Sequence, residues 1–413
     1  MNKTIEPFIY SGEIISNTSK SYFQRAIAII AVSKSTCQVY GSCDEDDVKV
    51  ALSIFKSIGG KIKKDKNSVF LDSRNVVAAQ SISVFCGESG LSTRMFGTVL
   101  TSLFLTTKLN GDKSIINREI DFSELSQLGV IVENKSKNLP IVLNGKLNYG
   151  TIDINGSDGS QLISGLLIAL FSLNGDSIVN VKDLVSKPYI LMTISILKAF
   201  GISVVNEEFS KFIVKGNQIP KKKEYHVEGD WSGAAFHLVG AAISGEVTIK
   251  GLNLDSLQAD IAILNALILC GAQIAKEKNC ITVKKDRLES FVFDATNCPD
   301  LFPSLVVLAS CCNGRTKISG VNRLSNKESN RAVVLQLEFK KLGVEIEIID
   351  NDMFILGAKK ITGNKVNSHG DHRIAMALAI MASVSESSII IENSEVVAKS
   401  YTKFYSDLEK VIS

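Results

Sequence analysis

Residues 197–204 read Leu-Lys-Ala-Phe-Gly-Ile-Ser-Val, and residues 339–346 read Phe-Lys-Lys-Leu-Gly-Val-Glu-Ile. In both stretches a helical pattern ends in an apolar residue followed by Gly, and a strand-like alternation begins directly after it. Glycine adopts the left-handed backbone conformation without steric cost, so it is expected just after the last turn of a helix. This arrangement occurs five times, with gaps of 70, 72, 70 and 72 residues, at Gly59, Gly129, Gly201, Gly271 and Gly343.

A second series with nearly the same period marks the starts of more apolar helices. These starts are spaced 70, 70, 70, 70 and 71 residues apart, at Ser21, Leu91, Gln161, Trp231, Leu301 and His372. Segments 161–173 and 301–311 are apolar nearly all round, which is typical of helices enclosed within a domain. The sequence therefore predicts an α/β protein of six repeats of about 70 residues, each with a buried helix, a helix closed by Gly and short Val/Ile-rich strands.

The repeat number also predicts the domain organisation. A chain of 413 residues exceeds the length at which one hydrophobic core usually keeps growing, so six repeats indicate two domains of three. A sixth closing glycine would fall just past residue 413, which leaves the last repeat without its final strand. Residues 4–9 could supply that strand, and both ends of the chain would then lie in one domain.

Composition limits the class of protein. Hydrophobic residues make up 45% and charged residues 22%, and the net charge is only +3, so neither disorder nor a nucleic-acid-binding tail is indicated. Residues 1–6 lack the apolar core of a secretion signal, and no run reaches the roughly 18 apolar residues of a membrane span. We expect a cytoplasmic protein with no nucleic-acid or membrane partner. The eight cysteines have no metal-ligand spacing, which predicts reduced, mostly buried thiols and no metal site.

Residues suited to binding anions cluster at the predicted helix starts. A helix N-terminus presents unpaired amides and a partial positive charge, which favour phosphate and carboxylate groups. Ser and Asp are also the preferred N-caps, so Asp230 taken alone favours a cap. Capping does not explain the arginines: Arg is scarce in this chain, yet Arg25, Arg94 and Arg373 lie in the first turns of three of the six helices. Their bidentate geometry predicts a small anionic substrate.

Motifs in a fixed order along the chain resemble the 5-enolpyruvylshikimate-3-phosphate synthase family. They are Lys-Ser-Tyr-Phe-Gln-Arg at 20–25, Gly-Glu-Ser-Gly at 87–90 with Arg94, Ser160-Gln161, Val-Ser-Lys-Pro-Tyr at 185–189, Glu-Gly-Asp at 228–230, Pro299-Asp300, Arg-Leu-Ser-Asn-Lys-Glu-Ser-Asn-Arg at 323–331, Asp-His-Arg at 371–373 and Lys399-Ser400. The resemblance implies the enolpyruvyl transferase fold, a two-domain inside-out α/β barrel with three βαβαββ repeats per domain. The domains would be 18–227, and 1–17 together with 228–413.

The resemblance also implies a reaction. The enolpyruvyl group of phosphoenolpyruvate would be transferred to the 5-hydroxyl of shikimate 3-phosphate with release of phosphate, a step toward chorismate and the aromatic amino acids. The hydroxyl adds to C2 while C3 is protonated, and the tetrahedral intermediate then loses phosphate. No metal or organic cofactor is implied, the partners are the two small-molecule substrates, and we expect a monomer.

Roles for individual residues follow from the same resemblance. Asp300 would be the base for the 5-hydroxyl, Glu328 would handle the methyl proton, and Lys20 would donate a proton as well as bind. The residues implied for phosphoenolpyruvate are Lys20, Gly90, Arg94, Arg118, Arg331, Arg373 and Lys399. Those implied for shikimate 3-phosphate are Lys20, Ser21, Arg25, Ser160, Gln161, Ser186, Tyr189, Asp300 and Lys327. The first domain would mainly bind shikimate 3-phosphate, and the second would hold the catalytic carboxylates, which so many cations should keep ionised.

The chain departs from the family pattern at five positions. Glu88 stands where Asn or Thr is usual, Leu91 where Thr is usual, Gly159 replaces one of two adjacent serines, Glu119 replaces Pro, and Asn330 replaces Asp. An extra carboxylate at Glu88 should weaken the binding of an anion unless Arg94 or a lysine pairs with it.

Two alternative functions remain open. One is the sister enzyme that transfers enolpyruvate to UDP-N-acetylglucosamine, but its usual Cys or Asp loop is not recognisable, and residues 186–189 fit shikimate 3-phosphate better. The other is a non-catalytic homologue of the same fold, which Glu88, Leu91 and Gly159 make conceivable. We favour a working enzyme because the implied catalytic and cationic residues are all present.

Overall fold

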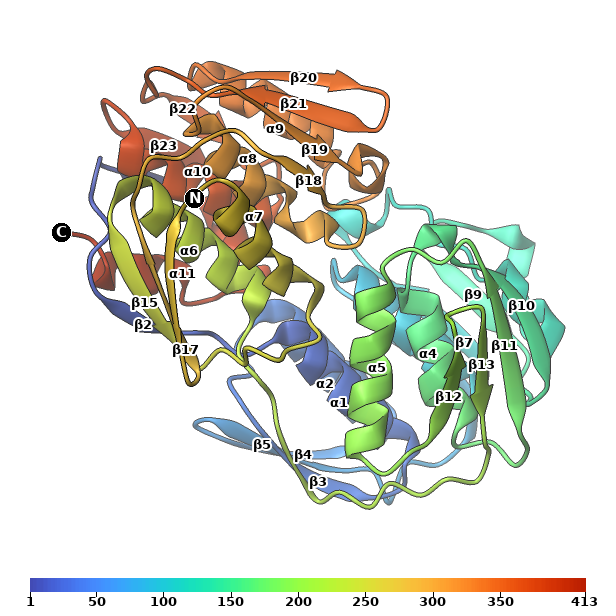
Figure 1. Ribbon diagram of the computed structural model, residues 1–413. Coiled ribbons are helices and arrows are strands. Elements are labelled where there is room, and N and C mark those ends of the chain that lie inside the picture. The colour runs from blue at the N-terminus through green and yellow to red at the C-terminus, as the bar shows by residue number, and fades with distance from the viewer. The chain divides into compact units, whose positions relative to one another are not determined.

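The computed structural model describes all residues, 1–413, and the chain divides into two compact units. Residues 18–227 form one unit, called here the N-terminal unit. Residues 1–17 and 228–413 form the other, called here the C-terminal unit. The two units contain the same number of sheets (Figure 1).

Buried helices fill the middle of the N-terminal unit. They are α1 (Lys20–Val32), the π-helical turn η1 (Ser92–Phe96) with α3 (Gly97–Thr101), and α4 (Gln161–Leu170). Nearly every residue of these helices is buried, and α4 and the second half of α1 are apolar nearly all round. π-Helical turns are rare in proteins, and those that occur are often found at functional sites. This one carries Arg94.

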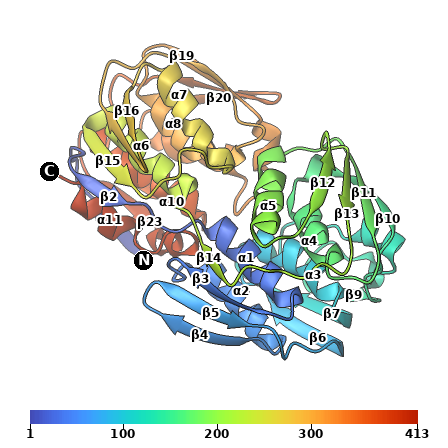
Figure 2. The ribbon, with the colours of Figure 1, turned by 60° about the horizontal axis from the view of Figure 1, so that its bottom comes forward.

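Three separate four-stranded sheets surround these helices. The first is β14 (Glu224–His226), β3 (Thr36–Tyr40), β5 (Ser68–Asp72) and β4 (Lys61–Asp65); the second is β6 (Ala79–Phe85), β7 (Phe104–Asn110), β9 (Ile141–Asn144) and β8 (Ile131–Val132); the third is β10 (Thr151–Asn155), β11 (Ser177–Lys182), β13 (Lys211–Val214) and β12 (Val204–Glu207). Each sheet has one parallel pair followed by antiparallel pairs, as in Ile152↔Val179 of β10 and β11. Figure 2 shows β3, β4 and β5 side by side, with α1 and α2 (Asp46–Ser57) above them.

The C-terminal unit repeats this plan around α6 (Trp231–Ser244), α8 (Phe302–Ser310) and α10 (His372–Met381). These three helices pack against one another, and Figure 1 shows them between the sheets. The sheets are β16 (Gln273–Glu277), β17 (Cys280–Lys284), β15 (Glu246–Lys250) and β2 (Glu13–Ile15); β18 (Val292–Asp294), β19 (Arg315–Ser319), β21 (Asp352–Leu356) and β20 (Glu345–Ile349); and β1 (Asn2–Ile5), β23 (Ile389–Glu392) and β22 (Lys365–Asn367).

The five glycines of the sequence repeat end helices in the left-handed conformation. Their φ angles lie between 81° and 93°. They follow α2, α5 (Lys187–Ala199), α7 (Ile263–Leu269) and α9 (Arg331–Lys341), and the 3-10 helix η3 (Ser123–Leu128) at Gly129. The closing role of glycine is therefore confirmed, but the second repeat closes with a short 3-10 helix instead of a full α-helix.

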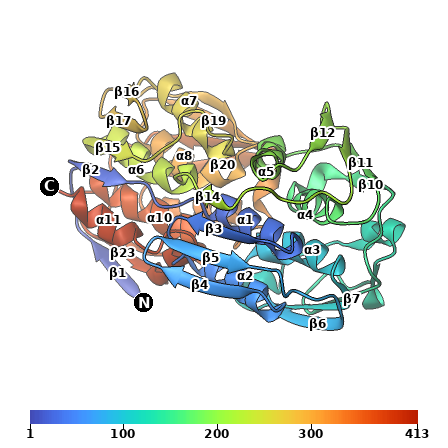
Figure 3. The ribbon, with the colours of Figure 1, turned by 90° about the horizontal axis from the view of Figure 1, so that it is seen from below.

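The N-terminal strand completes the last repeat. β1 pairs antiparallel with β23, so Asn2 faces Glu392 and Ile5 faces Ile389, and β22 lies parallel on the other side of β23. Figure 3 shows β1 beside β23. The chain then adds β2 to β15 of the fourth repeat before it enters the N-terminal unit at residue 18, and it returns at residue 228. The backbone amide of Asp230 donates to the carbonyl of Asn17 at 2.8 Å, so the two crossing segments are hydrogen-bonded neighbours within the C-terminal unit.

A buried aromatic cluster joins the two ends of the C-terminal unit to α6. The Tyr10 hydroxyl lies 3.4 Å from Nδ1 of His237, and the His237 ring lies 5.3 Å from that of Phe404 in α11 (Phe404–Lys410). His237 has no exposed surface, and its burial lowers the pKa of the imidazole to about 4. The neutral imidazole is therefore a packing residue of this unit.

The eight cysteines are all free thiols, and six of them are buried. At 14 residues α6 is the longest helix, and neither it nor any other helix is suited to crossing a membrane.

Candidate active site

The predicted starts of the buried helices agree closely with the structure. α1 begins at Lys20, α4 at Gln161, α6 at Trp231 and α10 at His372. Asp230 accepts a hydrogen bond from the amide of Gly233 at 2.8 Å, as the N-cap interpretation predicted. Asp371 caps α10 in the same way by accepting from the amide of Arg373 at 3.0 Å.

In the N-terminal unit, Lys20 lies at the start of α1 against a carboxylate. Its Nζ is 2.8 Å from Asp47 Oδ2, in the first turn of α2, and both side chains are about 85% buried. Gln24, one turn further along α1, donates to the Asp47 carbonyl and to the hydroxyl of Ser92 at 2.9 Å. This contact gives the Lys20 ammonium a negatively charged neighbour.

The guanidinium groups of Arg94 and Arg118 both lie close to Gly90. Arg94 Nη1 donates to Gln161 Oε1 at 3.2 Å, and its Nη2 donates to the carbonyl of Glu119 at 2.8 Å. A Cβ added to Gly90 would lie 3.1 Å from Arg94 Nη1 and 3.3 Å from Arg118 Nη1. The structure therefore brings two guanidinium groups and one amide side chain around a backbone position that has no side chain of its own.

The second set of predicted residues in this unit lies around α5. Ser186 precedes α5 in the left-handed conformation, with φ 59° and ψ 36°, which is costly for a residue other than glycine. Such backbone strain is concentrated at ligand-binding sites. Ser160 is the N-terminal neighbour of α4 and is buried. Ser21 lies in the first turn of α1, and its carbonyl accepts from Arg25 Nη1 at 3.0 Å.

Arg25 is held inside the unit. It is 1% exposed, its Nε donates to Thr193 Oγ1 at 2.8 Å, and its Nη2 donates to the carbonyl of Tyr189 at 3.3 Å. Burial lowers the pKa of its guanidinium to about 10, and the nearby tyrosines oppose this effect. The residue links α1 to α5, and with its bond to the Ser21 carbonyl it uses three of its five N–H donors.

In the C-terminal unit, Arg331 is the centre of a network of ion pairs. Its Nη1 donates to Asp300 Oδ1 at 2.8 Å, its Nη2 to Glu328 Oε2 at 2.6 Å, and its Nε to Asp371 Oδ2 at 2.7 Å. The guanidinium is 1% exposed, so these carboxylates replace water around it. Although its burial favours loss of the proton, the three carboxylates raise its pKa well above the usual value.

Asp300 receives three cations. Besides Arg331, Arg373 Nη2 donates to Oδ2 at 3.0 Å and Lys327 Nζ to Oδ1 at 3.2 Å. Burial opposes ionisation, but the cations hold the pKa of Asp300 well below its usual value. Burial also lowers the pKa of Lys327. Asp300 is 22% exposed and Glu328 16%, so both carboxylates retain access to solvent.

Lys399 supports the loop before α10. Its Nζ donates to the carbonyl of Gly370 at 2.7 Å, and the side chain is 7% exposed. The loop continues directly into Asp371 and Arg373, so Lys399 fixes the start of the helix that carries these residues.

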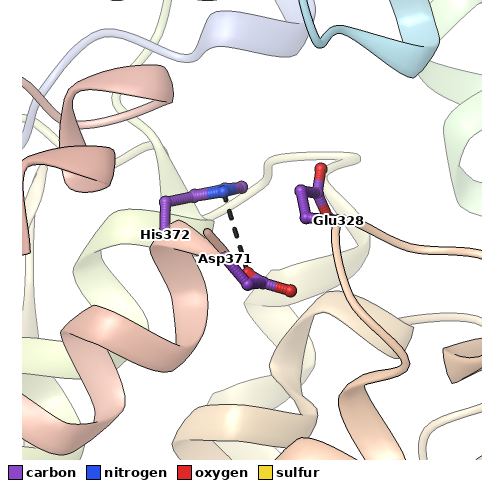
Figure 4. Close-up of side chains that lie close together, drawn as sticks. All are labelled: Glu328, Asp371 and His372. Carbon is purple, nitrogen blue, oxygen red and sulfur yellow. Dashed lines mark ion pairs between the residues drawn. The ribbon is translucent and has the colours of Figure 1, made fainter. Parts of the chain in front are cut away.

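Glu328, Asp371 and His372 lie close enough to suggest a metal site. One ligand atom from each falls within 4.8 Å of the others, and Figure 4 shows the three side chains together. Arg331, however, already pairs with an oxygen of Glu328 and with an oxygen of Asp371. A metal ion would have to compete with this buried guanidinium, and we assign no metal site here.

The chain is similar to known proteins over nearly its whole length. The family model described as EPSP synthase (3-phosphoshikimate 1-carboxyvinyltransferase) matches residues 8–408. The chain belongs to the EPSP synthase family. A 3-phosphoshikimate 1-carboxyvinyltransferase of Clostridium acetobutylicum is 35% identical over 98% of this chain and 96% of its own length. One of Clostridium novyi is 32% identical over 99% and 97%.

A solved structure of the EPSP synthase of Acinetobacter baumannii has the same fold. It matches with a TM-score of 0.82 and 24% identity, and covers 100% of this chain and 98% of its own. The two-domain α/β fold implied by the motifs is therefore confirmed.

Glu88, a departure from the family pattern that we expect, is paired with a lysine. Lys113 Nζ lies 3.3 Å from Glu88 Oε1, and the Ser114 hydroxyl donates to Oε2 at 2.9 Å. Glu88 raises the pKa of Lys113. Arg118 Nη2 approaches the same Ser114 hydroxyl at 3.4 Å. The extra negative charge is thus offset by the kind of pairing that the sequence had named as the condition for anion binding.

The other departures have local explanations. Gly159 has φ 113° and ψ −169°, a conformation that is essentially restricted to glycine, so this backbone would not accept the usual serine without strain. Asn330 caps α9 by accepting from the amide of Val333 at 3.4 Å, which an Asp could also do. Glu119 offers its backbone carbonyl to Arg94, and that contact does not depend on its side chain. Leu91 is buried at the start of the helix that continues into η1.

Sequence reasoning gave no role to three carboxyl residues near the predicted cations. Asp47 pairs with Lys20, Asp371 pairs with Arg331, and Asp260 lies 3.9 Å from Arg373. Asp371 belonged to a recognised motif and could have been assigned from its neighbours. Asp47 and Asp260 had no signal, because only the fold brings each of them to its cation.

Proposed function

We propose that the chain transfers the enolpyruvyl group of phosphoenolpyruvate to the 5-hydroxyl of shikimate 3-phosphate and releases phosphate. The observation that carries this proposal is that Lys327, Arg331 and Arg373 all form ion pairs with the single carboxylate of Asp300. So many cations on one partly exposed carboxylate are suited to a substrate with both a phosphate and a carboxylate group.

The proposed chemistry begins with an exchange of partners. An anionic substrate that takes Arg331 and Arg373 from Asp300 weakens the attraction that holds the Asp300 carboxylate ionised. Asp300 then becomes a stronger base and accepts the proton of the 5-hydroxyl as its oxygen bonds to C2. Glu328, also paired with Arg331, is proposed to carry a proton to C3 and later to remove one as the bond from C2 to the phosphate oxygen breaks.

Binding roles are proposed for the remaining residues of the set. In the N-terminal unit, the strained Ser186 and the helix start at Ser160 and Gln161 support a site for the shikimate phosphate. The residues proposed to bind shikimate 3-phosphate are Lys20, Ser21, Arg25, Ser160, Gln161, Ser186, Tyr189, Asp300 and Lys327. For phosphoenolpyruvate they are Lys20, Gly90, Arg94, Arg118, Arg331, Arg373 and Lys399. The negative charge on the phosphate and carboxylate oxygens of phosphoenolpyruvate shifts as the tetrahedral intermediate forms, and these cations would stabilise it.

A phosphate-release assay tests the reaction. Purified protein with both substrates should release inorganic phosphate, and the organic product should carry the enolpyruvyl ether. Release that needs UDP-N-acetylglucosamine in place of shikimate 3-phosphate would assign the chain to the sister reaction. No release with either acceptor at millimolar concentration would support a non-catalytic homologue and overturn the proposal.

We also propose that the enzyme works as a cytoplasmic monomer without a metal or organic cofactor, in the route to chorismate. Sedimentation equilibrium of the purified protein checks the first point. Activity that survives prolonged treatment with a chelator checks the cofactor requirement.

A further inference from the structure

Asp260 is a buried carboxyl group to which the reaction above gives no task. It lies in the 3-10 helix η6 (Ala259–Ala262) of the C-terminal unit and is 1% exposed. Its Oδ2 accepts a hydrogen bond from the Ser232 hydroxyl, in the first turn of α6, at 2.5 Å. Its Oδ1 has no hydrogen-bond partner. A buried carboxylate usually has several donors, so one with a bare oxygen is poorly stabilised in its charged form.

The guanidinium of Arg373 lies between Asp260 and Asp300. Nη2 donates to Asp300 Oδ2 at 3.0 Å, while Nη1 lies 3.9 Å from Asp260 Oδ2. The orientation of Arg373 therefore depends on the charge of two carboxyls. The closer contact is with Asp300, and the pull from Asp260 acts on the opposite nitrogen.

Other charged and titratable groups also face Asp260. They are Asp300 from η7 (Pro299–Leu301), Asp230 from the N-cap of α6 and the Cys298 thiol just before η7. Burial raises the pKa of Asp260 to about 7, Arg373 opposes this rise, and Asp300 and Asp230 add to it. Apart from His372, the ion-pair network contains one more carboxyl group than it has Lys and Arg side chains. A proton on Asp260 balances that excess.

We propose that Asp260 is a positioning residue for Arg373, and that its carboxyl takes up a proton when phosphoenolpyruvate binds. This inference rests on the proposed function, because it takes Arg373 as a ligand of that substrate. With a proton on Asp260, Arg373 has one carboxylate fewer to satisfy and can turn its guanidinium to the substrate. Without the proton, the Asp260 charge both retains Arg373 and repels the incoming anion.

The affinity for phosphoenolpyruvate should therefore fall as Asp260 loses its proton. We expect the KM for phosphoenolpyruvate to increase about tenfold as the pH is raised through about 7, which corresponds to one pKa unit of coupling. The kcat at saturating phosphoenolpyruvate should change less, because Asp260 does not contact the reacting atoms in this scheme.

Three variants make the test specific. Asp260→Asn keeps the shape and an acceptor for Ser232, and should leave only the pH dependence that comes from the substrate's own phosphate. Ser232→Ala removes the one donor to the charged carboxylate and should move the increase in KM to higher pH. Asp255→Asn changes an exposed carboxyl on the preceding loop and should follow the unmodified protein. A KM that depends on pH equally in Asp260→Asn and in the unmodified protein would overturn the proposal.

A binding experiment separates this inference from the proposed reaction. Titration calorimetry with phosphoenolpyruvate alone, near pH 7 in buffers of different ionisation enthalpy, reports proton uptake without turnover. We expect the unmodified protein to take up a fraction of a proton per substrate bound, and Asp260→Asn to take up less. Equal uptake by the two proteins would contradict the role of Asp260 even if phosphate release is normal. Absence of phosphate release with a normal difference in uptake would count against the reaction alone.

Discussion

Arg331 Nε donates to Asp371 Oδ2 at 2.7 Å, and the two side chains are 1% and 0% exposed. The pair links the start of α9 to the N-cap of α10, because Asp371 also accepts from the backbone amide of Arg373. A buried pair is costly to break from one side, and loss of Asp371 would also remove the N-cap of α10.

Replacing Asp371 with Ala should therefore destabilise the C-terminal unit strongly. We expect a loss of about 3–5 kcal/mol in the free energy of unfolding, measured by urea titration. Glu347→Ala, which breaks the exposed pair with Arg315, is the matched control and should cost at most about 1 kcal/mol. Equal losses in the two variants would show that the burial of the Arg331 pair has no special consequence.

Asp300→Ala should abolish turnover while substrate binding stays detectable. Loss of a positioned general base usually costs about 10²–10⁴ in rate, so phosphate release should fall to that extent. Asp294→Asn, at an exposed carboxyl in the preceding strand, should retain the rate. A rate that survives in Asp300→Ala would show that another group takes the proton.

The stability of the C-terminal unit should depend on the pH through His237. Its pKa is about 4 in the folded state and about 6.5 when unfolded, so the unfolded chain binds more protons between these values. The stabilisation is fully present above about pH 6.5 and is lost as the pH falls toward 4, by about 3 kcal/mol in total. Urea midpoints of the unmodified protein and of His237→Phe should differ in slope across this window. His226→Gln, at an exposed imidazole, should keep the unmodified slope.

Lys113→Ala should weaken phosphoenolpyruvate binding by leaving Glu88 without its cation. Lys113 is 75% exposed, so solvent screens the pair and we expect an increase in KM of up to about fivefold. The double variant Glu88→Gln with Lys113→Ala should recover most of the lost affinity, because neither charge then remains. If the double variant binds as poorly as the single one, the effect of Lys113 does not pass through Glu88.

Gly159→Ser, which introduces the residue expected from the family pattern, should not improve the enzyme. The backbone at φ 113° and ψ −169° is strained for any side chain, so we expect a loss of about 1–3 kcal/mol in stability. Urea titration and the KM for shikimate 3-phosphate measure the two effects. Ser157→Ala, two residues away and exposed, is the control and should change neither quantity much.

The repeat period predicted much of the fold because it depends on local chemistry. The end of a helix at a glycine is determined by only a few adjacent residues, so Gly201 and Gly343 predict the ends of their helices directly. The short 3-10 helix before Gly129 was not foreseen, since the apolar pattern of residues 123–128 does not distinguish it from the end of an α-helix.

The candidate site was less accessible to sequence reasoning. Motifs named the cations and the two proposed catalytic carboxylates, but partners distant in sequence were missed. Asp260 lies 113 positions before Arg373, and nothing in its neighbours identifies the contact. Likewise, the compensation of Glu88 by Lys113 depends on how two loops approach each other. Such pairs are set by tertiary structure, where charge and burial are decided together.

The two crossings of the chain have a consequence for synthesis. Residues 18–227 form the N-terminal unit without interruption, whereas β2, made earlier, pairs only with β15 at residues 246–250. During synthesis on the ribosome, β1 and β2 therefore remain without their partner strands while an entire unit is translated and can fold. The segment 18–227 is, in genetic terms, an insertion, and the residues that flank it are already neighbours because Asp230 is hydrogen-bonded to Asn17. A gene in which residue 17 is joined directly to residue 228 would encode the other unit as one continuous reading frame.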